Sequence, residues 1–454
     1  MSRGRMVLLS LVVLLAALLG GAAWYLRPIA PIATGYAAKT VCSAHFVSGR
    51  TVDDGLGDLP PNPLVPLLRM SVNPSERTVR TSLLGVWTST AYATPGLGCT
   101  LSDDRPSFSA PTTEVSPPDP GTPWPAGDGP ADLPDDVDGA ALDAAIATAF
   151  AEDDPEGRLR NSRAVVVVRD GALIAERYGD GFAADTPLHG WSMGKSIANA
   201  IVGRLVGDGR LDLDDRDLLE EWDGEERADI TLDQLLRMTP GLAFDEVYEP
   251  DTDATRMLFR PGDTGAYAAD QPLVAQPGEH WSYSSGTTNI LCDLAQDASG
   301  LGTDLAHELV FAPLGMTTAT IEPDASGGLI CSSFPYATAR DWARFGQWFL
   351  QDGEWDGAQL LPSGWVEYST TPVEIADPGT PYGAQWWLNA GPGGQLRMPS
   401  VPADAYWASG NEGQQVVVIP SEGLVVVRLG FSGSFSGVEW GLEPLLAGII
   451  DATS

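Results

Sequence analysis

The sequence predicts an α+β fold of three layers (α/β/α), in which terminal helices flank an antiparallel sheet beside an inserted helical subdomain. Two hairpins carry this prediction, because β-branched runs flank an Asp-Gly turn at 164–178 and a Pro-Ser-Glu-Gly turn at 414–429. The long segment between the hairpins is rich in helical patterns and lacks a regular alternation of strand and helix. That absence argues against a parallel sheet.

The remaining elements follow from hydrophobic periodicity and from composition. We expect a helix at 139–151, strands at 164–169 and 172–178, helices from 192 and at 287–298, strands at 414–419 and 424–429, and a final helix at 438–450. A stretch at 106–136 is dense in Pro, Gly and Asp and predicts a linker or an extended strap, because proline fixes φ and lacks a donor. It separates a small N-terminal region at 28–105 from a large region at 137–454.

The N-terminus predicts export. Residues 1–5 carry Arg3 and Arg5 and precede an uncharged apolar run at 6–26. At ~1.5 Å per residue this run reaches about 30 Å, enough to cross a bilayer, and the preceding charges predict a cytoplasmic N-terminus. The run is longer than the apolar part of a signal peptide, which favours an uncleaved anchor, although small residues at 21–23 offer a cleavage site. We expect the rest of the chain on the periplasmic side of the inner membrane, or secreted if the helix is cleaved.

Four cysteines fit an oxidising compartment, and none lie in CxxC spacing. Cys42 and Cys99 flank the small region and are expected to join its two ends. Cys292 and Cys331 either pair or remain buried thiols, because sequence does not fix connectivity.

The charge balance excludes one class of function. The 454 residues include 61 Asp and Glu against 26 Lys and Arg, a net charge of −35. Proteins that bind nucleic acid need a basic face, so no nucleic-acid partner is expected. The only lysines are Lys39 and Lys195. Lysine, unlike arginine, can lose its proton at a useful pH.

Lys195 follows Ser192 by three residues at the start of a helical pattern. Side chains at that spacing share one face of a helix. A hydroxyl becomes a nucleophile when a base takes its proton, and a lysine partly desolvated at a helix N-terminus can be that base. Taken alone, the pattern also fits a capping serine followed by an exposed lysine.

The same residues fit a second motif. Residues 190–194 (GWSMG) match the G-x-S-x-G nucleophile elbow of α/β-hydrolases. The elbow needs a buried strand just before the serine and a catalytic histidine late in the chain. The preceding segment is not strand-like, and no histidine lies in the last third. This interpretation is therefore the weaker alternative.

Further along, Tyr283 and Ser285 form a Tyr-x-Ser just before the helix expected at 287–298. A tyrosine near a cationic lysine can reach a phenolate-like state and carry a proton to a leaving group or from water. A tyrosine in a serine-rich turn is more often structural. Its position after Ser192 and Lys195 favours the catalytic interpretation here.

Taken together, the segments SMGK, LRMTPGLAFDE, YSS, FAPLGM, ATARDWARFGQW, LPSGW, YGAQWW and YWASGNEGQQVVVIPSEGLVVVRLG resemble the β-lactamase-related serine hydrolases. That group includes class C β-lactamases, DD-peptidases, esterases and 6-aminohexanoate-dimer hydrolases, and the chain is most similar to the last branch. The resemblance spans roughly 140–450 and implies a penicillin-recognising fold. It implies Ser192 as the acylated nucleophile, Lys195 as its base and Tyr283 as the group that serves the leaving group and the deacylating water. Ser285 would take a substrate-binding position often held by Asn.

The resemblance also predicts an oxyanion hole formed by the backbone N–H groups of Ser192 and Asn411. In the family a Lys-Thr-Gly or His-Thr-Gly precedes the latter position, whereas this chain has Ser409 and Gly410 after an alanine. The missing cation argues against β-lactam and carboxypeptidase substrates, whose carboxylate it would hold.

Aromatic residues near this strand suggest a substrate wall. Trp387 and Trp407 are the candidates, although core packing explains either equally well. Tyr248 and Asp251 lie where the related amide hydrolases have a loop that covers the site.

No metal or cofactor is predicted, since the one His-Glu pair lacks the second histidine of HExxH. We therefore expect an exported or membrane-tethered serine hydrolase that cleaves an ester or a small amide. A catalytically silent binding or scaffold protein on the same fold is the alternative.

Overall fold

The computed structural model describes residues 3–60, 64–129, 133–377, 379–433, 435 and 438–454. The large region is built on a six-stranded antiparallel sheet in the order β14-β15-β16-β17-β7-β8. Its strands are β7 (Ser162–Arg169), β8 (Ala172–Tyr178), β14 (Trp387–Leu388), β15 (Tyr406–Gly410), β16 (Gln414–Ile419) and β17 (Leu424–Gly430). The valine-rich strands β16 and β17 lie inside this sheet and are buried along their whole length.

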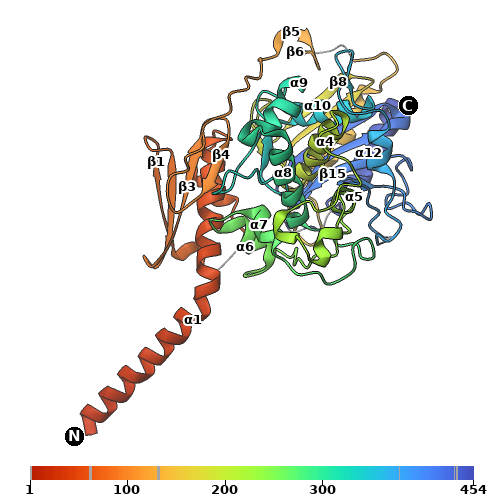
Figure 1. Ribbon diagram of the computed structural model, residues 1–454. Helices are drawn as coiled ribbons and strands as arrows, with labels where there is room; N and C mark the ends of the chain where they lie inside the picture. Colours follow the sequence, from red (N-terminus) through yellow and green to blue (C-terminus); the bar gives the residue numbers. More distant parts are fainter. Residues whose placement is uncertain (1–2, 61–63, 130–132, 378, 434, 436–437) are drawn as a thin grey trace.

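The helices of the large region are α3 (Gly139–Phe150), α4 (Gly194–Gly207), α5 (Leu232–Leu236), α6 (Asp253–Phe259), α7 (Thr264–Ala269), α8 (Ser285–Ser299), α9 (Ala312–Leu314), α10 (Ala339–Leu350), α11 (Trp365–Thr370) and α12 (Leu442–Thr453). Short strands complete it: β9 (Leu188–His189), β10 (Thr320–Ile321), β11 (Pro335–Ala337), β12 (Glu354–Trp355) and β13 (Ala358–Gln359). Helices α4 to α9 belong to the part inserted between the two hairpins (Figure 1).

Helices cover both faces of the six-stranded sheet. On one face, Val165 and Val167 of β7 share a hydrophobic core with Leu446 of α12 and with α3. On the other face, Val166 shares a core with Phe345 of α10. Successive side chains of a strand point to opposite faces, so the unbroken valine run is what a sheet covered on both sides requires. The predicted three-layer α+β arrangement is confirmed.

The start of the last helix was predicted wrongly. The last helix begins at Leu442 rather than at residue 438 and continues to Thr453. Gly441 has φ 117°, a backbone conformation that glycine adopts without a steric cost, so the preceding residues form a turn instead of helix.

The N-terminal region consists of a long helix and a small sheet. Helix α1 (Arg3–Phe46) is followed by α2 (Val52–Gly57) and by β1 (Leu68–Asn73), β2 (Thr78–Leu83), β3 (Trp87–Thr94) and β4 (Gly98–Leu101), which form an antiparallel sheet in that order. The second half of α1 packs on this sheet, and a disulfide joins Cys42 to Cys99. Among the described helices, α1 alone is long and apolar enough to cross a membrane, a property that N-terminal signal sequences share.

The N-terminal region is tied to the large region by a buried ion pair. Lys39 Nζ lies 2.8 Å from a carboxylate oxygen of Glu322, and both side chains are almost fully buried. The other oxygen of Glu322 accepts hydrogen bonds of 2.7 Å from Ser43 Oγ and from the Cys99 backbone N–H. The second disulfide, Cys292–Cys331, lies within the large region.

The proline-rich segment at 106–136 contacts the large region. It contains β5 (Asp119–Pro123) and β6 (Gly127–Gly129), joined by a turn, and its other described residues form neither helix nor strand. The side chain of Trp124 is 3% exposed, and Arg344 donates hydrogen bonds to the carbonyls of Pro125 and Gly127. The strap is therefore fixed along the surface of the large region.

Candidate active site

Ser192 lies in a tight turn before a helix. The turn, a 3₁₀ element over Trp191–Met193, directly precedes α4, so Ser192 is not itself in the α-helix as the sequence suggested. Trp191 has φ 50°, which is costly for a bulky side chain. A Cβ added at Gly194 would overlap the backbone carbonyl of Cys331, so only glycine fits at this position.

The structure nevertheless brings the predicted serine and lysine together. Lys195 Nζ donates hydrogen bonds to Ser192 Oγ (3.1 Å), to Ser285 Oγ (2.9 Å) and to the carbonyl of Ser332 (3.1 Å). Lys195 is 2% exposed. Burial disfavours the ammonium form and lowers the pKa of Lys195 to about 8, although the charge of Glu246 opposes this shift. A lysine with this pKa has an accessible neutral form near physiological pH.

The interpretation as an α/β-hydrolase elbow was wrong. That fold requires a parallel sheet whose strand leads directly into the serine. Here the large sheet is antiparallel, and Ser192 follows the two-residue strand β9, which belongs to a separate small sheet with β10 and β11.

Glu246 is a site residue that sequence reasoning missed. Its carboxylate accepts hydrogen bonds from the backbone N–H (2.7 Å) and the hydroxyl (2.6 Å) of Ser285. Burial raises the pKa of Glu246, and Lys195 opposes that rise. Ser285 thus connects Glu246 to Lys195 through its hydroxyl. Because Glu246 stands in a loop with several other acids, nothing in the sequence distinguishes it from a solvated surface residue.

Ser285 was expected to bind substrate, but it is completely buried. Its hydroxyl is already hydrogen-bonded to Lys195 and to Glu246. It begins α8, where Ser284 is the N-cap and accepts a hydrogen bond from the Thr287 N–H. The helix start therefore fixes Ser285 against Lys195.

Tyr283 lies next to the same lysine. Lys195 Nζ is 4.7 Å from the centre of the Tyr283 ring. Burial, reinforced by Tyr382 and Glu246, raises the pKa of Tyr283 well above its usual value, and a hydrogen bond with Ser192 opposes the rise. The phenolate-like state expected from the sequence is therefore disfavoured, and the phenol is a neutral proton donor in this structure.

The end of strand β15 lies beside the turn that contains Ser192. A Cβ on Gly410 would overlap the carbonyl oxygen of Gly190, so the two segments are in close contact. The indole N–H of Trp191 donates to Glu412 (3.2 Å), just after the exposed Asn411. This contact brings the end of β15 to the turn from which the predicted oxyanion hole would be built.

A buried arginine holds that strand end in place. Arg428 donates to the carbonyls of Gly413 (2.8 Å) and Glu412 (3.3 Å), and its guanidinium packs on Trp440. Ser409 is engaged by Gln415, whose amide donates to its hydroxyl (3.0 Å). No cation stands at the Ser409 position.

The aromatic candidates divide into two groups. Trp387 and Tyr248 lie near the site, since Trp387 packs on Tyr283 (5.1 Å between ring centres) and Tyr248 packs edge-on against Trp191 (5.7 Å). Trp407 was a wrong candidate: it is completely buried in the core beneath α3 and α12. Its place in β15 directs its side chain to the sheet face opposite the core that contains Trp191.

Asp251 forms ion pairs with Arg256 (2.8 Å) and Arg260 (3.7 Å), so its carboxylate has a structural role in the loop. No group of three or more His, Cys, Asp or Glu is placed to hold a metal in the part of the chain that the structure describes.

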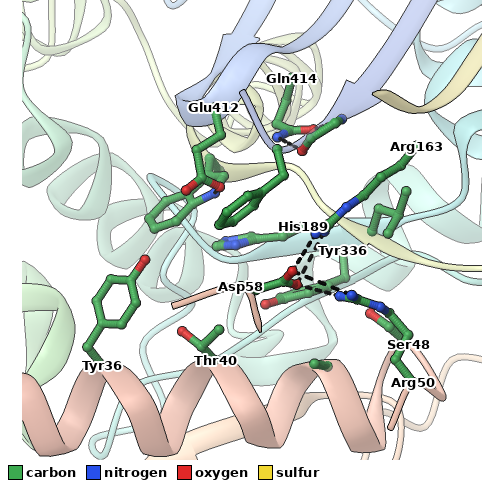
Figure 2. Close-up of a pocket in the computed structure, with 15 residues that line it drawn as sticks. Tyr36, Thr40, Ser48, Arg50, Asp58, Arg163, His189, Tyr336, Glu412 and Gln414 are labelled. Atoms are coloured by element: carbon green, nitrogen blue, oxygen red, sulfur yellow. Dashed lines mark hydrogen bonds and ion pairs between the residues drawn. The ribbon is translucent and has the colours of Figure 1, made fainter. Parts of the chain in front are cut away.

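A small polar cavity lies behind Trp191, between α1 and the large region (Figure 2). Arg50 and Arg163 both bind Asp58 there, and Glu412 lies across the cavity. Its volume of about 30 Å³ suffices for one or two water molecules. Neither Ser192 nor Lys195 lines it.

Comparison with known proteins agrees with this geometry. Residues 147–430 match the β-lactamase family. The 6-aminohexanoate-dimer hydrolase of Paenarthrobacter ureafaciens is 27% identical over 291 residues, which are 59% of this chain and 71% of that protein. A solved Bacillus anthracis protein named for the same activity is 25% identical, with a TM-score of 0.54 over 65% of this chain and 79% of its own. A family VIII carboxylesterase at 15% identity shares the fold, with a TM-score of 0.53 over 71% of this chain and 99% of its own. Because the family match covers most of the large region, this chain belongs to the β-lactamase family.

Proposed function

We propose that this protein is a serine hydrolase that cleaves an ester or a small amide through an acyl-enzyme on Ser192. The observation that carries the proposal is the hydrogen bond from a buried Lys195 to Ser192 Oγ, together with the pKa of Lys195 near 8. A buried amine with this pKa accepts a proton from the serine hydroxyl far more readily than an ordinary lysine does.

We propose the following steps. Neutral Lys195 takes the hydroxyl proton as Ser192 Oγ attacks the substrate carbonyl carbon, and the backbone N–H groups of Ser192 and Asn411 stabilise the oxyanion. The bond to the leaving group then breaks, and Tyr283 or the Lys195 ammonium supplies its proton. In deacylation, water attacks the acyl carbonyl carbon and gives up a proton to Lys195, directly or through Tyr283. The bond between this carbon and Ser192 Oγ then breaks, the carboxylic acid leaves, and Ser192 Oγ takes the proton.

The substrate class is inferred from charge. β-Lactams and peptide C-termini carry a carboxylate, and a cation at the position of Ser409 would bind it. This chain has a neutral serine there, bonded to Gln415, and a net charge of −35. A strongly negative protein disfavours the approach of anionic substrates. Neutral or cationic acyl compounds therefore fit better.

We also propose that α1 anchors the protein in the inner membrane with the large region on the periplasmic side. Two observations support this: the apolar first half of α1 packs against nothing in the described structure, and both cysteine pairs form disulfides. An apolar helix without packing partners is typical of a membrane-spanning segment, and disulfides persist in an oxidising compartment.

A serine-reactive fluorophosphonate tests the chemistry. The full-length protein in detergent micelles is treated with the reagent, and adducts are located by mass spectrometry, with Ser192→Ala as the matched control. The proposal expects one adduct, on Ser192. Folded protein without that adduct would contradict it and would favour the silent scaffold. The rates of hydrolysis of p-nitrophenyl esters, small amides and nitrocefin then identify the preferred substrate class. Rapid turnover of nitrocefin, a β-lactam, would contradict the inference that the neutral Ser409 disfavours substrates with a carboxylate.

A further inference from the structure

The hairpin between β2 and β3 ends in an exposed apolar tip. Leu84 and Val86 are 61% and 71% exposed, and Leu67, which directly precedes the neighbouring strand β1, is 50% exposed. Leu84, Gly85 and Val86 connect the paired residues Leu83 and Trp87, and the first two have positive φ, 53° at Leu84 and 71° at Gly85. A turn of this kind normally has Asn, Asp or Gly at the first position, because leucine is strained at positive φ. An apolar side chain is thus kept at the tip against both steric and solvent preference.

This hairpin tip points toward the apolar half of α1. Strand β3 runs beside α1 in the same direction, because Ser89 contacts Thr34 (2.8 Å between hydroxyl oxygens) and Ala93 pairs with Cys99, which is bonded to Cys42. Val86 precedes Ser89 by three residues, or about 10 Å of strand. Along α1, about 10 Å corresponds to about seven residues, counted from Thr34 toward the N-terminus. The tip is therefore level with residues 25–28, where the apolar run at 6–26 ends.

The arrangement in space agrees with this estimate. Figure 1 shows the free half of α1 inclined toward the side on which the β1–β4 sheet lies. Helix α1 contains Pro28 and Pro31, and proline inside a helix is a common cause of a bend. Trp24 and Tyr25, 79% and 65% exposed, stand at the end of the apolar run, where aromatic residues favour the headgroup layer.

Charge also favours a membrane surface. The segment from 64 to 101 contains three arginines, Arg69, Arg77 and Arg80, against one acid, Glu76. It is a positive patch in a chain whose net charge is −35. Arg69 and Arg80 are exposed, and none of the ion pairs among the described residues includes them. Basic residues near an anionic bilayer add to the attraction of an apolar anchor.

We propose that the hairpin tip (Leu67, Leu84 and Val86) is a second membrane contact, which inserts into the headgroup region of an anionic bilayer beside α1. This inference rests on the proposed anchoring of α1. A helix alone leaves the domain free to rotate about one tether, whereas a second contact fixes the orientation of the sheet. Through the Lys39–Glu322 pair, it also fixes the large region relative to the membrane.

Site-directed labelling of the full chain tests the contact. All four natural cysteines are in disulfides, so one added cysteine gives one free thiol for an environment-sensitive nitrobenzoxadiazole label. The labelled variants are Val86→Cys at the tip, Ser75→Cys in the exposed turn at the opposite end of the sheet as control, and Leu18→Cys in the apolar run. Each is reconstituted in vesicles of phosphatidylcholine and phosphatidylglycerol that contain doxyl-labelled lipid.

We expect the nitroxide lipid to reduce the emission of the label at positions 18 and 86 by about two-fold or more, with little effect at position 75, because only groups within the bilayer or its headgroups meet the quencher. Quenching at 18 without quenching at 86 overturns the tip contact and leaves the anchor intact. Equal quenching at 75 and 86 also overturns it. If the label at position 18 is not quenched, both the proposed anchoring of α1 and the tip contact are contradicted. Replacing Arg69 with glutamate should weaken quenching at 86 in the anionic vesicles, whereas an unchanged signal contradicts the charge argument. Fluorophosphonate labelling of each variant verifies its fold.

Discussion

The rate of acylation should rise with pH through the titration of Lys195. Its pKa of about 8 leaves about one molecule in eleven with a neutral lysine at pH 7, against about nine in ten at pH 9. Only the neutral amine accepts the proton of Ser192. Fluorophosphonate labelling should therefore be about ten-fold faster at pH 9 than at pH 7. The measurement is the labelling rate from pH 6 to pH 10 on the full-length protein.

Three variants test the proton-transfer role of Lys195 more directly. Glu246→Gln removes a negative charge that favours the ammonium form, so the midpoint of the pH profile should move to lower pH. Lys195→Arg should be nearly as inactive as Lys195→Ala, because arginine stays protonated. A rate that is flat from pH 6 to pH 9, or an arginine variant that keeps most of its activity, would refute the proton-transfer role.

The same titration affects stability. Because the pKa of Lys195 falls from 10.5 to about 8 on folding, the unfolded chain binds more protons between these pH values. The contribution of Lys195 to the free energy of unfolding should rise with pH across this window, by about 3 kcal/mol. Urea titrations of the wild type and of Lys195→Met measure it as the difference between the two pH dependences. A constant difference would mean that the pKa of Lys195 is not lowered.

Three further changes test other parts of the structure. Tyr283→Phe removes the proposed phenol proton donor and should lower ester turnover by about 100-fold or more with a small change in KM, and unaltered turnover would exclude the proton-donor role. Gly410→Ala places a methyl group against the carbonyl of Gly190 and should reduce acylation while Ser192 remains intact, so full activity would show that the strand end is free to move. Lys39→Met leaves Glu322 charged and buried and should cost about 3–5 kcal/mol in urea unfolding, with partial recovery in a double variant that adds Glu322→Gln; a single variant as stable as the wild type would contradict the importance of this pair.

Much of the fold was predictable because it is encoded locally. The hairpins at β7–β8 and β16–β17 follow from β-branched runs and short turns, and the periodicity of α3 and α8 from residues within a few turns of one another. Boundaries were less predictable. The start of α12 depends on the backbone of Gly441, and the 3₁₀ turn at Ser192 depends on the close packing of Gly194 against Cys331.

In the candidate site, too, some residues could be predicted from the sequence and others could not. Ser192 and Lys195 could be paired from sequence, because three residues of chain bring any two side chains together at a helix start. Glu246 could not be found, since its partner Ser285 is 39 residues away and its neighbours are also acidic. The carbonyl of Ser332, which holds Lys195 in place, is a backbone group and has no signature in the sequence.

The two lysines illustrate what each level determined. The sequence alone established that these are the only lysines in a chain whose other strong bases are arginines, and that one of them lies next to a candidate nucleophile. The tertiary structure decided their roles. Lys39 is buried against a carboxylate nearly 300 residues away, which ties the N-terminal region to the large one. Lys195 is buried, and desolvation lowers its pKa to about 8, while none of the ion pairs among the described residues includes it. Desolvation depends on everything packed around a group, so the chemistry of either lysine is a property of the folded chain.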